Sequence, residues 1–186
     1  MQLFIKNMVC NRCKMVVQAE LDKLGLHPIS VTLGLVEIQE ELSDPELYKI
    51  EEALTPFGFE LLKDRKRQIV EQIKTTVIEL VHYIPQLGNV NLSTYLTEKF
   101  AMSYSSLSST FSEIEQVTIE KYFILQKIER VKELLNYGEL TLGEIAYQLH
   151  YSSVAHLSAQ FKKVSGETPT SYRLAQKNTR KTIDEV

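Results

Sequence analysis

The stretch LTLGEIAYQLHYSSVAHLSAQFKKVSGETPTSYR, residues 140–173, decides the fold of the larger part of this 186-residue chain. Its main positions recur 50 residues upstream with the same residue types in the same order. The matching positions are Leu107 and Leu157, Ser108 and Ser158, Phe111 and Phe161, Thr118 and Thr168, and Tyr122 and Tyr172. A repeat at a fixed interval indicates a duplicated structural unit.

Each copy has the pattern of a helix, a serine-containing turn and a second helix. In both second helices the leucine and the phenylalanine are four residues apart, so they lie on one inward face. Between the copies, EKYFILQKIERVKELL has an apolar stripe typical of one long connecting helix. Two linked helix-turn-helix units form a DNA-binding module, whereas an ordinary helical bundle has the same periodicity. Periodicity alone leaves both interpretations open.

Residues 140–173 and the helix before them resemble the AraC/XylS family of bacterial transcription regulators. The residues that carry this resemblance are Ile145, Ala146, Leu157, Phe161, Lys162, Lys163, Gly166, Thr168, Pro169 and Arg173. The resemblance implies an all-α C-terminal domain with two helix-turn-helix units joined by a long helix. It also implies a cytoplasmic regulator whose two recognition helices enter successive major-groove segments of double-stranded DNA.

The family resemblance also implies which side chains contact DNA. The positions facing the bases are Val154, Ala155 and Ser158 in the second recognition helix, and Ser105, Ser108 and Ser109 in the first. Small side chains contact thymine methyls or form single hydrogen bonds, but they cannot pair with guanine as arginine does. We therefore expect the phosphates to supply most of the affinity, through Lys162, Lys163 and Arg173. Arg173 has the alternative role of a structural ion-pair partner, and His156 is given little functional weight.

Three departures separate the two copies from each other or from the family pattern. Gln116 stands in the first copy where Gly166 stands in the second, and His150 stands where the family commonly has glycine. Glu113 and Glu115 stand opposite Lys163 and Ser165 in the repeat. Acidic side chains on a recognition helix repel phosphates, so we expect the first unit to bind DNA more weakly than the second.

The first 64 residues have the pattern of a separate α+β domain. Alternating or continuous apolar runs predict strands in QLFIKNM, PISVTL, LVEIQEEL and FELLKD, and helical periodicity predicts helices in KMVVQAELDKLGL and SDPELYKIEEAL. The resulting order, βαββαβ, is that of a ferredoxin-like fold.

Cys10 and Cys13 are the two cysteines of the chain, and they lie between the first predicted strand and helix. A helix N-terminus and the neighbouring Arg12 and Lys14 favour thiolates over thiols. Two thiolates are soft ligands that suit Cu(I), and Zn(II) fits if further ligands join them. The same spacing also occurs in thiol–disulfide redox pairs, and a third alternative is a domain used only for protein contacts.

MVCNRC, residues 8–13, resembles the metal-binding motif of heavy-metal-associated domains of copper chaperones and metal-pumping ATPases. The resemblance implies that Cys10 and Cys13 bind the metal and that Met8 supports the loop from below. It also places Phe57 beside the metal. Asn7 departs from the glycine usual in that family, although asparagine tolerates unusual backbone angles.

Charge and composition complete the predicted organisation. Residues 1–64 have 6 Lys or Arg against 11 Asp or Glu, whereas residues 65–186 have 15 against 13. The predicted parts are a heavy-metal-associated-like domain at 1–64, an amphipathic linker helix at 65–88, an AraC-type DNA-binding domain at 89–176 and a C-terminal tail at 177–186. The linker helix either docks on the helical core or mediates pairing of two chains.

Together these features predict a metal-responsive, copper-dependent regulator of transcription. The expected partners are duplex DNA and a soft metal ion, with a second copy of the chain or RNA polymerase as candidates for protein contact. No signal peptide, membrane-spanning run or catalytic constellation is recognisable, so a cytoplasmic protein without enzymatic activity is expected. The alternative is an AraC-type regulator whose CxxC domain senses oxidation or docks a protein.

Overall fold

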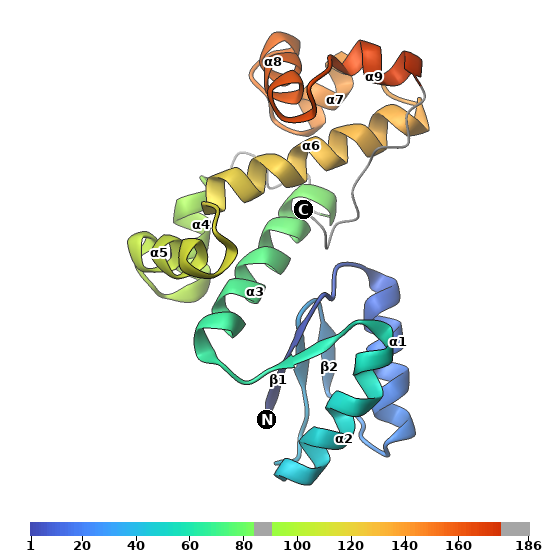
Figure 1. Cartoon of the computed structure of the whole chain (residues 1–186), viewed down its shortest axis with the longest axis vertical. Helices are drawn as coiled ribbons and strands as arrows, with labels where there is room; N and C mark the ends of the chain where they lie inside the picture. Colours follow the sequence, from blue (N-terminus) through green and yellow to red (C-terminus); the bar gives the residue numbers. More distant parts are fainter. Residues whose placement is uncertain (84–90, 176–186) are drawn as a thin grey trace. The chain divides into compact units, whose positions relative to one another are not determined.

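The computed structural model describes residues 1–83 and 91–175, which form two compact units. Unit 1 comprises Met1–Thr75, and unit 2 begins at Thr76. The division falls inside helix α3 (Arg65–Ile78), which is drawn in green in Figure 1. None of the helices in the described residues is long and apolar enough to cross a membrane.

Unit 1 is built on a four-stranded antiparallel sheet. The strands are β1 (Gln2–Lys6), β2 (Ser30–Thr32), β3 (Leu35–Glu37) and β4 (Glu60–Leu62), in the spatial order β2-β3-β1-β4. Helix α1 (Asn11–Lys23) follows β1, and helix α2 (Asp44–Leu54) with the 3₁₀ turn η1 (Thr55–Phe57) precedes β4. The predicted order of two helices and four strands in this region is thus observed.

Local sequence explains where these elements begin and turn. Ser43 and Glu46 form a capping box at the start of α2, where Pro45 lies in the first turn. Gly34 adopts φ 74° in the tight β2–β3 turn, and its carbonyl accepts a hydrogen bond from the backbone N–H of Ile5 at 3.0 Å. These signals are local, so they were readable in the sequence.

The sheet of unit 1 is covered on both faces. Leu3 and Ile5 of β1 belong to the core that includes α1 and α2. Phe4 points to the opposite face, because side chains alternate along a strand, and it is also buried. Buried Ile69 and Ile73 of α3 supply cover for that face. The predicted domain therefore ends too early at residue 64, because the first part of α3 packs within unit 1.

Unit 2 is helical throughout its described residues. The π-helical turn η2 (Glu79–Tyr83) precedes residues 84–90, so the end of the predicted linker helix lies outside the described residues. The helices that follow are α4 (Leu92–Phe100), α5 (Tyr104–Glu115), α6 (Ile119–Tyr137), α7 (Leu142–Gln148), α8 (Val154–Ser165) and α9 (Pro169–Ala175). The predicted C-terminal tail at 177–186 also lies outside them.

The repeat detected in the sequence is a structural repeat. Helices α4, α5 and α6 begin 50 residues before α7, α8 and α9 respectively, and α5 ends 50 residues before α8. The Phe111 and Tyr122 rings lie 5.6 Å apart between their centroids, and so do those of Phe161 and Tyr172. Both pairs are fully buried, so each copy closes over the same aromatic contact.

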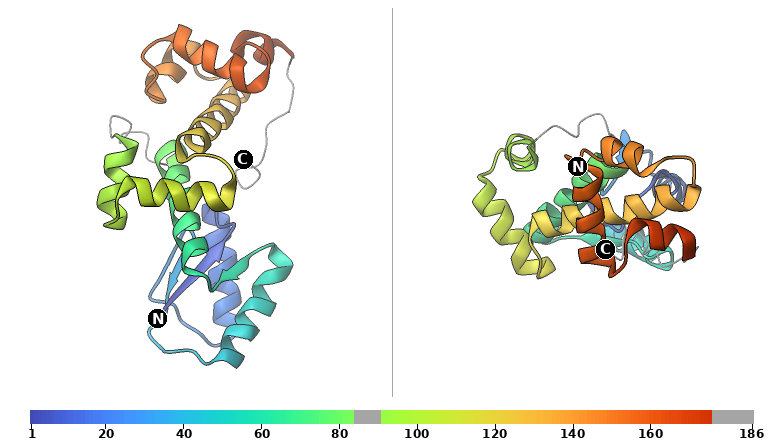
Figure 2. Two further views of the ribbon diagram at one scale, coloured as in Figure 1. Left: turned by 60° about the vertical axis from the view of Figure 1, so that its left-hand side comes forward. Right: turned by 90° about the horizontal axis from the view of Figure 1, so that it is seen from above.

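Helix α6 joins the two copies, with α4 and α5 at one end and α7, α8 and α9 at the other (Figures 1 and 2). Its residues Ile128, Val131 and Leu135 pack into the core of the second copy. The turn η2 contacts α6 through His82, whose Nε2 lies 3.1 Å from the Oε1 of Gln126. Of the two roles predicted for the helix around residue 75, docking on the helical core is thus observed for its last turn.

Candidate functional site

The two recognition helices of the repeat, α5 and α8, begin at matched serine caps. The Ser103 hydroxyl accepts from the backbone N–H of Ser106, and the Ser153 hydroxyl accepts from that of His156. Each cap satisfies a backbone donor that the first helical turn leaves free. Both helices therefore start at a defined residue, which fixes the side chains that face outward.

The outward face of α8 lies opposite its buried residues, Leu157 and Phe161. At 100° per residue, the centre of that face falls near Ala155 and Ala159, with His156 and Lys163 on one side and Lys162 on the other. All five are exposed. Of the residues predicted to face bases, Ala155 is central, Val154 is 41% exposed on the flank and Ser158 is half-buried.

The same geometry holds for α5, which buries Leu107 and Phe111. Ser105 and Ser109 are exposed on the outward face, as predicted, whereas Ser108 is half-buried. Glu113 is exposed, but Glu115 is half-buried. Only one of the two acids that distinguish this helix thus lies on the outward face.

His156 and Ala159 are outward-facing residues that the sequence analysis did not select. The Nδ1 of His156 lies 3.0 Å from the Ser152 hydroxyl, and the imidazole meets the Tyr151 ring edge-on at 5.3 Å between centroids. These contacts orient the imidazole at the start of α8. The spacing of four residues from Ala155 to Ala159 was the available signal, because such residues share a helical face.

A buried lysine ties α6 to the turn before α8. The Nζ of Lys127 lies 4.0 Å from the centre of the Tyr151 ring, and the Tyr151 hydroxyl donates to Oε1 of Gln160 at 2.7 Å. Burial lowers the pKa of Lys127 to about 8. Burial also raises the pKa of Tyr151. The second recognition helix is thus held to α6 by a cation–π contact and a hydrogen bond.

The first copy uses different chemistry at the start of its recognition helix. The hydroxyl of Tyr104, the first residue of α5, donates to the carboxylate of Glu120 on α6. Burial and this hydrogen bond raise the pKa of Tyr104, and the same bond lowers the pKa of Glu120. Repeated backbone geometry is therefore supported by unrelated side-chain contacts in the two copies.

Three cations of the second copy were predicted to bind phosphate. Lys162 and Lys163 are exposed at the C-terminal end of α8. Arg173 differs, because it is half-buried and its Nη2 donates to the carbonyl oxygen of Leu140 at 2.6 Å. This bond connects α9 to the loop before α7, which explains a structural role without the ion pair that the sequence suggested.

In unit 1, Cys10 and Cys13 converge at the start of α1. Cys10 is the N-cap residue, Cys13 lies in the first turn, and their sulfur atoms are 3.4 Å apart. Burial raises the pKa of Cys10, but hydrogen bonds from Cys13 and Arg12 and the charge of Arg12 bring it below its ordinary value. Burial and the Cys10 sulfur raise the pKa of Cys13. One thiol is thus the readier thiolate.

The residues around the cysteine pair fit a two-sulfur ligand set. Met8 is fully buried in the core beneath the loop, and Phe57 is 50% exposed in η1. Across residues 1–83 and 91–175, no cluster of three or more His, Cys, Asp or Glu side chains is arranged to hold a metal ion. The described donor set suits an ion that accepts two thiolates, as Cu(I) does, better than one that requires four ligands.

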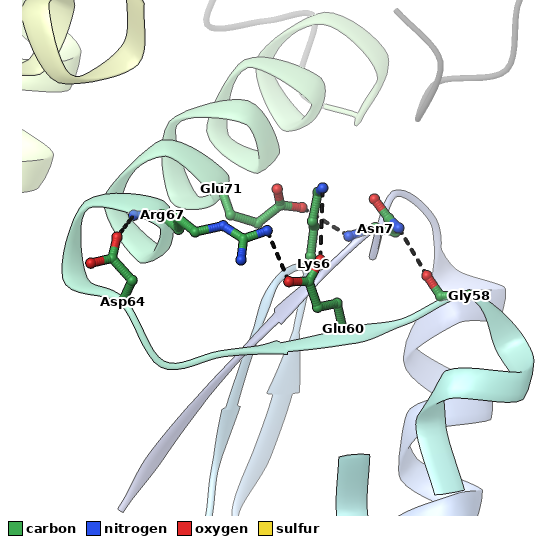
Figure 3. A network of polar contacts seen from close by, with 7 residues as sticks. All are labelled: Lys6, Asn7, Gly58, Glu60, Asp64, Arg67 and Glu71. Carbon is green, nitrogen blue, oxygen red and sulfur yellow. Dashed lines mark hydrogen bonds and ion pairs between the residues drawn. The ribbon is translucent and has the colours of Figure 1, made fainter. Parts of the chain in front are cut away.

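The loop before the cysteines has an unusual backbone. Asn7 has φ 70°, a left-handed angle for which glycine is favoured. Its side-chain amide donates to the carbonyl of Gly58 at 2.8 Å, and its backbone N–H donates to Oε1 of Glu71 at 2.9 Å (Figure 3). The departure from glycine that the sequence showed is thus accommodated by two hydrogen bonds.

Comparison with known proteins places the helical region. A family model described as a helix-turn-helix domain matches residues 96–175. An uncharacterised HTH-type transcriptional regulator of Staphylococcus aureus is 28% identical over 138 residues, covering 61% of this chain and 18% of that protein. The xylose operon regulatory protein of Escherichia coli is 25% identical over 138 residues, covering 74% of this chain and 35% of that protein.

A solved structure has the same fold over much of the chain. The C-terminal domain of AraT, a response regulator from Geobacillus stearothermophilus, superposes with a TM-score of 0.53 at 23% identity and covers 64% of this chain and 94% of that one. This chain spans 18% of the length of the staphylococcal relatives that it matches. The duplicated helical units, their matched caps and these likenesses lead to one identification: residues 96–175 form a helix-turn-helix domain of the AraC/XylS type.

Proposed function

We propose that this chain is a cytoplasmic, non-enzymatic transcription regulator that binds duplex DNA through α5 and α8. The observation that carries the proposal is the duplication itself, in which two capped helices present exposed faces at matched positions. In this proposal the two helices read successive major-groove segments, roughly 34 Å apart along the duplex. Small side chains at Ala155, Ala159 and Ser109 admit close approach to base edges.

Phosphate contacts by Lys162 and Lys163 supply much of the proposed affinity. The test is to select a binding site from random duplex DNA and to measure affinity by fluorescence anisotropy across a salt series. Lys162→Ala with Lys163→Ala should weaken binding and reduce the slope of log K against log salt by about 2, since each phosphate contact contributes about 0.9.

A matched control removes the same charge elsewhere. Lys23 and Lys49 are exposed lysines of unit 1, and Lys23→Ala with Lys49→Ala should leave the salt slope unchanged. Equal effects of the two double variants would contradict the phosphate role of α8, and failure to select any site would contradict DNA reading.

We further propose that unit 1 has a ferredoxin-like fold and makes the regulator responsive to a soft metal ion, Cu(I) before Zn(II). The element order βαββαβ and the strand order β2-β3-β1-β4 support the fold assignment. The two convergent sulfurs of Cys10 and Cys13 support the metal. Bound Cu(I) would supply a cationic centre held by two thiolates, and Met8 would support the loop.

Titration of the reduced protein tests the metal site. Wild type should bind one Cu(I) per Cys10–Cys13 pair, and Cys10→Ser with Cys13→Ser should bind none. Tight Zn(II) binding would require further ligands, including those of a second copy of the chain, and the mass of the metal-bound protein would then be that of a dimer. Equal metal uptake by wild type and the double variant would contradict the metal-responsive function.

A second candidate function is sensing of oxidation by the same pair. The 3.4 Å separation of the sulfurs and the lowered pKa of Cys10 favour it. A peroxide would take two electrons and two protons from the thiols, giving a disulfide and two waters from hydrogen peroxide. Mass spectrometry after peroxide treatment, followed by DNA-binding measurement, distinguishes this function from the metal response. Protein docking by unit 1 is the outcome if neither metal nor peroxide acts on the pair.

A further inference from the structure

Glu71, on helix α3, contacts the loop that carries the cysteine pair. Its side chain is 5% exposed, and its Oε1 accepts the backbone N–H of Asn7 at 2.9 Å. Asn7 is the residue directly after β1 and lies three positions before Cys10. A segment outside the βαββαβ region thus contributes a buried carboxylate to the base of the cysteine loop (Figure 3).

The contact acts on a residue with an unfavourable backbone angle. Asn7 has φ 70°, which side-chain-bearing residues adopt only where surrounding contacts hold them. The other contact on Asn7 is its side-chain bond to the Gly58 carbonyl, from the loop after η1. Asn7 is therefore held from α3 on one side and from the η1 loop on the other. A buried carboxylate itself requires such a donor, so the two groups stabilise each other.

We propose that Glu71 is a positioning residue for the Cys10–Cys13 pair, so that the cysteine site is incomplete without α3. This inference rests on the proposed role of the pair as the responsive site. The backbone between Asn7 and Cys10 is short, and its angle at Asn7 sets the direction in which the chain enters α1. Loss of the Glu71 acceptor releases that angle and changes the presentation of the two sulfurs.

Anchoring of α3 on the sheet has other sources in the structure. Ile69 and Ile73 are buried, and the side-chain amide of Gln68 donates to the Leu62 carbonyl at 2.9 Å. Arg67 pairs with Glu60 on β4 at 2.8 Å. A purely structural role for Glu71 would therefore resemble that of a neighbouring core residue such as Val70, which is 2% exposed. This residue provides the matched control.

The experiment compares the alkylation rates of the two thiols in the full-length reduced protein without metal. Iodoacetamide is applied at one fixed pH, and peptide mass mapping gives the ratio of the Cys10 rate to the Cys13 rate. Glu71→Ala should change this ratio by roughly threefold or more, since it removes a hydrogen bond to a charged group. Glu71→Gln should keep a ratio near that of wild type, because its amide oxygen can still accept from Asn7.

Urea unfolding of each variant separates positioning from stability. Val70→Ala should lower the unfolding midpoint and leave the thiol ratio unchanged. Where Glu71→Ala does not fold, Glu71→Met fills the same space without an acceptor and takes its place. A wild-type ratio in the Ala or Met variant, an equal change in Val70→Ala, or a Gln variant as altered as the Ala variant would each overturn the proposal.

The assay contains neither metal nor DNA. A protein that binds no copper can therefore still show the effect of Glu71, and a copper-responsive protein can lack it. The two proposals consequently fail on different measurements.

Discussion

At the scale of single residues, the C-cap of α5 shows what one substitution costs a repeat. Gln116 has φ 58° where its counterpart Gly166 has φ 85°. A left-handed angle disfavours any side chain with a β-carbon, so glycine suits this cap. The first copy therefore contains a strained residue that the second copy avoids.

Gln116→Gly should raise the free energy of unfolding by about 1 kcal/mol, because it removes this strain. Urea denaturation measures the change. The reverse substitution, Gly166→Gln, is the matched variant and should lower stability by a similar amount. A Gln116→Gly variant less stable than wild type would show that the side-chain bond of Gln116 to the Glu113 carbonyl outweighs the strain.

Lys127 gives unit 2 a stability that depends on pH. Its pKa of about 8 lies below the ordinary value of 10.5, so the folded protein binds fewer protons than the unfolded chain between these values. Stability should therefore rise with pH across that window. Below pH 8 the buried charge costs stability, which the Tyr151 ring partly offsets.

Lys127→Met should flatten the dependence and raise the free energy of unfolding at pH 7 by about 1 kcal/mol, after allowance for solvent screening and the cation–π contact. Urea denaturation of both proteins at pH 7 and pH 10 measures the difference between them. Parallel pH profiles for wild type and Lys127→Met would contradict the assignment.

At the scale of elements, α5 and α8 share a backbone and differ in charge. Glu113 is exposed on the outward face of α5, where the repeat places Lys163 on α8. Glu115, which the sequence suggested as an equal contributor, is half-buried. The charge contrast between the two helices thus depends mainly on one position.

Glu113→Lys should tighten non-specific DNA binding at low salt, by up to about tenfold for one added phosphate contact. Glu115→Lys is the control of identical charge change and should have a smaller effect. Anisotropy with a duplex of unrelated sequence measures both. Equal effects would show that charge acts at long range and that the outward face of α5 is not at the DNA.

Sequence reasoning succeeded for elements whose signals are local or repeated. The 50-residue interval fixed the boundaries of both helical copies, and caps such as Ser43 and Ser153 mark helix starts directly. It failed where burial depends on distant segments. Ser158 was expected to face outward, and α3 was expected to be a linker. Ser158 is half-buried, and the partners of α3 on the sheet lie far away along the chain.

At the scale of the whole molecule, function requires that one unit affect the other. Helix α3 begins in unit 1 and its last three residues, from Thr76 to Ile78, belong to unit 2. A ligand shifts an equilibrium only when it binds two states unequally. Metal binding at Cys10 and Cys13 must therefore favour one DNA-binding state for the proposed response to occur.

Cu(I) should change the dissociation constant for the selected DNA site by about 5–150-fold, the range of typical coupling free energies. The measurement is anisotropy at fixed salt under reduction, with and without Cu(I). Cys10→Ser is the control and should give one constant in both conditions. The same constant for wild type with and without the ion would mean that the two units are energetically independent.

Helix α6 has a geometric consequence for the sites that this protein can recognise. Its 19 residues complete the first copy at one end and support the second at the other, over a length of about 28 Å. It is a rigid ruler between two readers. Insertion of a single residue would turn the second reader by about 100° and move it by about 1.5 Å. Substitutions along α6 can therefore accumulate without changing the spacing of the site, whereas any insertion or deletion would put the two readers out of phase with the turns of the double helix.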